Sequence, residues 1–184
     1  MIARRRVLGP SAAALAAAGA LLVVTVLAGS PAASGASPHI IWLSPRGFVT
    51  GQNIAGGHLT LSSPSGDEEH VITDTVGDLQ WVSYPLQISN QLKIRQVITC
   101  YKVDNATSYI SQVRLTRSKI PPTATVVYDD PADLTSTGGA CRTGMMVSPI
   151  SVSGAITLSL RLKFSSTAHA IDIGAIGIVT TGSP

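Results

Sequence analysis

The sequence predicts an all-β protein: an antiparallel β-sandwich of jelly-roll or immunoglobulin-like type with about eight to ten strands. The first observation behind this prediction is that apolar and polar residues alternate with a period of two over long stretches. The second is that no window beyond the N-terminal segment carries the apolar stripe of an amphipathic helix. The third is that Gly, Pro, Ser and Asp fill the stretches between the alternating runs, as is typical of turns.

The first 36 residues have the order of a secretory signal peptide. Three arginines at 4–6 precede a small and apolar run at 12–28, and a stretch of small residues follows. We expect a signal helix here, with cleavage after Ala28 or Ala36. Paired arginines also resemble a twin-arginine export signal, and the run approaches the ~18 residues of a membrane anchor. Export route and cleavage therefore stay open, but the expected location is secreted or in the cell envelope, with membrane contact only through this segment.

The charge balance argues against a nucleic-acid partner. The 184 residues carry 13 basic and 10 acidic side chains, a formal excess of +3. The arginines at 4–6 account for all of that excess, so the chain after the leader is formally neutral. Nucleic-acid binding requires clustered basic residues that release counterions from phosphates. The sequence has no such cluster after the leader.

The remainder of the chain divides by composition. Residues 37–78 are rich in Ser and Gly and contain three candidate edge strands, at 39–43, 58–62 and 70–73. Residues 79–184 are expected to form the core of the sandwich. Its candidate strands are 79–84, 91–103, 108–117, 123–128, 145–152, 154–164 and 170–179.

Residues 154–164 alternate most regularly. The side chains expected to face the core are Ile156, Leu158, Leu160, Leu162 and Phe164. In 91–103 the same rule places Leu92, Ile94, Ile98 and Cys100 on one face, and Lys93, Arg95, Val97, Tyr101 and Val103 on the other. In 108–117 it groups Tyr109 with Val113 and Leu115, opposite Gln112 and Arg114. The last strand, 170–179, is almost continuously apolar and contains two glycines, which indicates a central strand with a bulge.

A polar break separates two of these strands. Asp104 and Asn105 favour a turn, and we interpret residues 104–108 as the turn of a hairpin. Asn105 also begins an Asn-Ala-Thr glycosylation sequon. Turn chemistry alone accounts for this segment, and whether Asn105 carries a glycan stays open.

Cys100 and Cys141 are the only cysteines of the chain. Because the export signal implies an oxidising compartment, we expect them to form a disulfide. Two separate buried thiols are the alternative. A metal site is disfavoured, since neither a Cys-x-x-Cys spacing nor a neighbouring histidine pair is present.

Two groups of residues are candidates for binding. Asp129, Asp130 and Asp133 place three carboxylates within five positions, the kind of hard oxygen ligand that calcium prefers. A solvated turn is the competing interpretation, because the regular calcium-loop pattern is missing. The second group, Trp42, Trp81 and Tyr84, is a candidate aromatic platform for a sugar, against the common role of Trp as a core filler.

Signatures of catalysis are missing from the sequence. Gly-x-Ser-x-Gly, Ser-x-x-Lys and Gly-rich phosphate loops do not occur, so an enzyme is disfavoured and no catalytic residue is assigned. We expect an exported, non-catalytic β-sandwich with a structural, adhesive or binding role, whose partner is a cell-surface glycan or a protein. The alternatives are a carbohydrate-binding module and a small calcium-dependent or hydrolytic protein. No cofactor is expected other than calcium in the last case.

Overall fold

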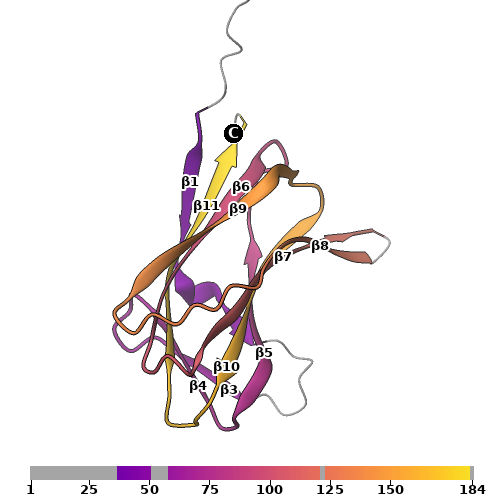
Figure 1. Cartoon of the computed structure of the whole chain (residues 1–184). Coiled ribbons are helices and arrows are strands. Elements are labelled where there is room, and N and C mark those ends of the chain that lie inside the picture. Colours follow the sequence, from indigo (N-terminus) through magenta and orange to yellow (C-terminus); the bar gives the residue numbers. More distant parts are fainter. Residues whose placement is uncertain (1–36, 51–57, 121–122, 183–184) are drawn as a thin grey trace, which may run out of the picture. The chain divides into compact units, whose positions relative to one another are not determined.

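The computed structural model describes residues 37–50, 58–120 and 123–182, so the expected leader at 1–36 lies outside it. Eleven strands and one short 3-10 helix form in these residues (Figure 1). In chain order they are β1 (His39–Leu43), η1 (Pro45–Gly47), β2 (Val49–Thr50), β3 (Leu59–Ser62), β4 (Glu69–Thr73), β5 (Gly77–Leu86), β6 (Lys93–Val103), β7 (Tyr109–Lys119), β8 (Thr123–Asp130), β9 (Ala140–Ser151), β10 (Ala155–Phe164) and β11 (Ile171–Thr181).

The strands form two antiparallel sheets, which confirms the predicted all-β sandwich. The first sheet has the order β3-β4-β11-β6-β9, and β1 also pairs with β11. The second sheet has the order β2-β5-β10-β7-β8. In the described residues, no helix is long and apolar enough to cross a membrane.

The core lies between the two sheets and follows the period-two pattern. In β10 the five apolar side chains from Ile156 to Phe164 are at most 2% exposed, while the intervening residues face outward. The opposing sheet contributes Ile171, Ile173, Ile176 and Ile178 of β11, all fully buried. β11 is a central strand with a register shift between Ile173 and Ile176, as the glycine pattern indicated.

The expected side-chain faces of β6 and β7 are partly wrong because each strand contains a bulge. In β6 one extra residue, Arg95, is inserted opposite Val179 and Thr180 of β11, so Val97 and Thr99 continue the buried face of Ile94. In β7 the register shifts opposite Arg161 and Leu162. Val113 therefore lies on the inner face of the sheet and Tyr109 on the outer face. One extra residue reverses every later side chain of a strand, and simple alternation does not reveal where that residue is inserted.

Strands of the Ser/Gly-rich segment 37–78 take part in both sheets. β1, β2 and β3 each pair with a single strand, as edge strands do. Phe48 and Val71 from this segment are buried in the same core cluster as β10. The hydrophobic core therefore begins before residue 79.

The turn at 104–108 does not close a hairpin. It connects β6 of the first sheet to β7 of the second, because β6 pairs with β11 and β9 while β7 pairs with β10 and β8. Asn105 organises it: its carbonyl accepts from the amide of Ser108 at 2.9 Å, and its Oδ1 accepts from the amide of Thr107 at 3.0 Å. The segment is thus a crossing between the two layers.

Cys100 and Cys141 form a disulfide, as predicted. They lie directly opposite each other in the antiparallel pair of β6 and β9. Cys141 is exposed, so the bond lies on the outer side of the first sheet and ties its edge strand β9 to β6.

Candidate functional site

Several long polar side chains, among them Gln112, Arg114, Arg161 and Lys163, lie on the outer surface of the second sheet. Strand register places Trp81 of β5 beside Arg161 of β10, which lies beside Gln112 of β7. One step along, Ser159 of β10 lies beside Arg114 of β7, which pairs with Asp129 of β8. We call this surface the Trp81 face; its residues are Trp81, Ser83, Gln112, Arg114, Asp129, Ser159, Arg161 and Lys163.

Trp81 and Arg114 are in direct contact on this face. The guanidinium carbon of Arg114 lies 5.1 Å from the centre of the Trp81 ring. That position satisfies the geometry of a cation–π interaction. The indole is only partly exposed, and it contacts a side chain from β7, the second strand along the sheet.

Two side chains of the neighbouring strand β7 hold the carboxylate of Asp129. Its Oδ1 accepts from Nε of Arg114 at 3.1 Å, and its Oδ2 accepts from Nη2 at 3.4 Å. Nε2 of Gln112 donates to the same two oxygens at 2.7 and 2.8 Å. Gln112 is only 7% exposed, and its Oε1 has no hydrogen-bond partner within the described parts of the chain. The carboxylate is thus fixed beside the Trp81–Arg114 pair.

The remaining side chains of the Trp81 face are tied across strands. Nε of Arg161 donates to Oγ of Ser111 at 2.9 Å, and Nζ of Lys163 donates to the hydroxyl of Tyr109 at 3.1 Å. The hydroxyls of Ser83 and Ser159 are 2.9 Å apart. These bonds reduce the conformational freedom that long side chains would lose on binding a ligand.

The three aromatic residues predicted from sequence do not form one platform. Trp81 lies on the outer surface of the second sheet, whereas Trp42 lies in β1 of the first sheet and is 55% exposed, next to Gly177. Tyr84 packs against the core, with its ring 5.4 Å from that of Phe48 in an edge-to-face contact. Residues 81 and 84 of one strand point to opposite faces because their separation is odd.

The three aspartates do not converge either. While Asp129 binds Arg114 and Gln112, Asp130 accepts from the hydroxyl of Tyr128 at 3.3 Å and from Nε of Arg142 at 3.4 Å. Asp133 follows in the exposed connection after β8. Among the residues that the structure describes, no three acidic, histidine or cysteine side chains are grouped so as to hold a metal ion.

Tyr128 has a strongly perturbed phenol. Burial, followed by the negative charge of Asp130, raises its pKa to about 12. The hydroxyl therefore stays protonated over the whole physiological range and acts as a hydrogen-bond donor to Asp130. This pair lies at the edge of the second sheet, away from the Trp81 ring, on the strand that also carries Asp129.

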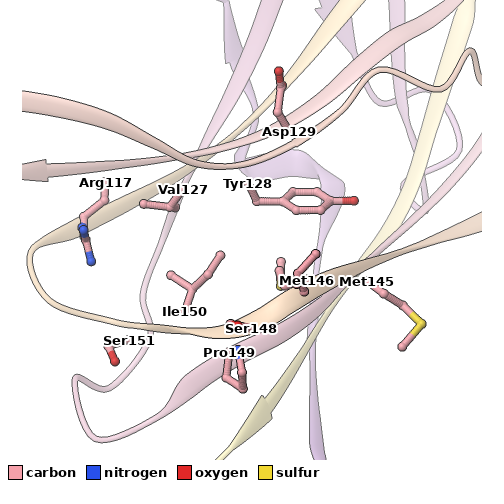
Figure 2. Close-up of a pocket in the computed structure, with 11 residues that line it drawn as sticks. Arg117, Val127, Tyr128, Asp129, Met145, Met146, Ser148, Pro149, Ile150 and Ser151 are labelled. Atoms are coloured by element: carbon pink, nitrogen blue, oxygen red, sulfur yellow. The ribbon is translucent and has the colours of Figure 1, made fainter.

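A pocket of about 570 Å³ lies between the edge strands β8 and β9 (Figure 2). Its lining is mixed: apolar side chains, among them Val127, Met146 and Ile150, lie beside Arg117, Tyr128, Asp129, Ser148 and Ser151. Figure 2 shows the carboxylate of Asp129 directed away from these side chains. The pocket and the Trp81 face are thus separated by strand β8.

Sequence reasoning missed Gln112, Arg114 and Arg161 as site residues. The signal was weak: each stands at an outward position of an alternating strand, as a solvated residue would. Only the order β5-β10-β7-β8 brings them beside Trp81 and Asp129.

Comparison with known proteins identifies the architecture. No family model and no curated protein sequence matches the chain. Among solved structures, the CBM22-1 xylan-binding domain of Xyn10C from Paenibacillus barcinonensis is 10% identical, with a TM-score of 0.50 over 82% of this chain and 100% of that one. The chain therefore has the β-sandwich fold of this domain. A CBM36 module solved with calcium and xylotriose is 14% identical, with a TM-score of 0.45 over 75% of this chain and 98% of that one.

Proposed function

We propose that the protein is an exported, non-catalytic glycan-binding module and that the Trp81 face holds the glycan. The observation that carries this proposal is the gathering of an indole ring with amide, carboxylate and guanidinium groups on one sheet surface. An aromatic ring offers an apolar surface to the C–H side of a sugar ring. The planar polar groups beside it supply both donors and acceptors for sugar hydroxyls.

The arrangement of these groups supports binding rather than catalysis. Asp129, the only carboxylate of the Trp81 face, already accepts hydrogen bonds from Arg114 and Gln112. Glycoside hydrolysis requires a pair of carboxyl groups on either side of the scissile bond. The side chains that define this surface do not provide such a pair, so they are suited to holding a sugar.

The fold supplies a first ligand to test. A domain with the same architecture binds xylan, which makes xylan and its oligosaccharides the natural first probes. Export is supported by the order of charges and apolar residues at 1–36 and by the disulfide between Cys100 and Cys141. A structural or adhesive role remains the interpretation to adopt if no glycan binds.

The test is affinity electrophoresis through gels that contain xylan, followed by a glycan array. Wild-type protein should be retarded by the polysaccharide, and Trp81→Ala should lose at least about tenfold in affinity, as expected for an aromatic hot spot. Trp42→Ala is the matched control, because Trp42 lies on the other sheet. Circular dichroism and the melting temperature verify that both variants fold.

Two outcomes would contradict the proposal. If Trp42→Ala abolishes retardation while Trp81→Ala does not, the glycan binds the first sheet. If wild-type protein binds nothing on the array or in the gels, the glycan-binding function is wrong, whatever the variants do.

A further inference from the structure

The pocket between β8 and β9 has the size of a site for a small molecule. Its volume of about 570 Å³ falls among those of ligand sites in proteins. It opens on the flank where each of the two sheets ends, since β8 and β9 are both edge strands. No residue of the Trp81 face other than Asp129 lines it.

Strand β9 contains a bulge beside the pocket. Ile150 pairs with Ile94 of β6 and Met145 pairs with Gln96, so residues 146–149 stand opposite Arg95 alone. Pro149 lies within the bulge, where its lack of an N–H group is tolerated. Met146 and Ile150 still pack against the core from this strand, and they present an apolar wall to the pocket.

Arg117 places a positive charge beside this apolar wall. It lies beside Ile156 of β10, which is 2% exposed, and Leu115, two residues before it on the same face of β7, is fully buried. Within the described residues, Nε of Arg117 is buried without an acceptor. Its Nη1 donates a long hydrogen bond to Oγ of Ser153, at 3.5 Å.

The described carboxylates do not neutralise this cation. The ion pairs of the described residues join Arg114 to Asp129 and Arg142 to Asp130, and the other two involve histidines. Asp129 lines the same pocket, yet its carboxylate binds Arg114. Figure 2 shows this carboxylate directed away from the other side chains of the pocket. A partly desolvated guanidinium without a counter-ion is costly, and an anion beside it removes much of that cost.

We propose that this pocket binds an elongated aliphatic carboxylate, with its head group on Arg117 and its chain along Val127, Met146 and Ile150. Guanidinium groups match carboxylates geometrically through parallel N–H donors. Methionine side chains adapt to a flexible apolar chain. The lining follows β9 from Met145 to Ser151, and such an extended wall suits a linear ligand better than a compact one.

The experiment is isothermal titration calorimetry of the purified protein with sodium octanoate. 1-Octanol, which has the same chain without the charge, is the matched ligand. Octanoate should bind at one site, and octanol should bind at least about tenfold more weakly because it forms no charge-assisted bond with Arg117. Absence of binding by octanoate, or equal binding of the two ligands, would overturn the proposal.

Variants locate the site. Arg117→Gln should weaken octanoate binding by about tenfold, through loss of the charge, whereas Arg95→Gln, an exposed arginine outside this pocket, should leave it unchanged. Met146→Trp fills the pocket without altering its charge and should also abolish binding, which covers the case in which Arg117→Gln does not fold. Undiminished binding by Met146→Trp would refute the assignment. Trp81→Ala should bind octanoate normally, so this test is independent of the glycan-binding proposal.

Discussion

Arg114 packs over the ring of Trp81, with its guanidinium carbon 5.1 Å from the ring centre, while the same guanidinium binds Asp129. Two strands and a charge pair therefore determine the position of one indole. We expect Trp81→Leu and Arg114→Met to show a coupling free energy of about 0.5–1 kcal/mol in a double-mutant cycle of urea unfolding.

The control cycle combines Arg114→Met with Trp42→Leu. Trp42 belongs to the other sheet, so the two substitutions should be additive within about 0.5 kcal/mol. A coupling for the Trp81 pair no larger than that of the control would show that the contact contributes nothing to stability.

The raised pKa of Tyr128 predicts that the protein loses stability at alkaline pH. Its pKa is raised from 10.0 to about 12 by burial and by Asp130. The unfolded chain then releases the phenolic proton at a lower pH than the folded chain, so the stabilisation present below pH 10 is lost as the pH rises through 12. Urea unfolding across this range should show that decline in the wild type and a smaller one in Tyr128→Phe. Equal declines would indicate that another group is responsible.

The side chain of Tyr128 occupies the space that a side chain at position 144 would need. A Cβ at this position would overlap the hydroxyl of Tyr128, so Gly144→Ala should destabilise the fold by about 1–3 kcal/mol through overpacking. In a Tyr128→Phe background the clash is reduced, and the cost of the alanine should fall. Chemical denaturation of the two single variants and the double variant measures this. An alanine that costs the same in both backgrounds would contradict the steric explanation.

The disulfide between Cys100 and Cys141 spans 41 residues. In the chain-entropy model a loop of this length stabilises the folded state by about 4 kcal/mol. The double variant Cys100→Ser and Cys141→Ser should show that loss in urea unfolding, and mass spectrometry after alkylation without reductant should find no free thiol in the wild type. Labelling of both cysteines in unfolded, unreduced protein would show that the bond does not form.

The sequence was sufficient for the strands and the main core. The regular alternation of β10 predicts its buried face because that strand is not bulged between Ile156 and Leu162 on the side of β5. All ten segments proposed as strands lie in or overlap strands of the structure, and only the two-residue β2 was not anticipated. The cysteine pair followed from the expected compartment and from there being no alternative partner.

What the sequence does not provide is the pairing of strands across space. The bulges in β6 and β7 each reverse a side-chain face, and polar–apolar alternation contains no marker for them. The turn at Asn105 looks like a hairpin locally, whereas the order of the sheets makes it a crossing. For the same reason Arg114 was not recognised beside Trp81: they are far apart in the chain and meet only because β10 lies between their strands.

The bulge of β9 has a consequence for self-association. A straight edge strand with a continuous row of backbone donors is a template onto which another chain can add. In β9 that row is interrupted by Pro149 and by the residues that loop out opposite Arg95. This edge is therefore poorly suited to edge-to-edge pairing with another copy of the chain. The same irregularity that opens a pocket also opposes aggregation through β9.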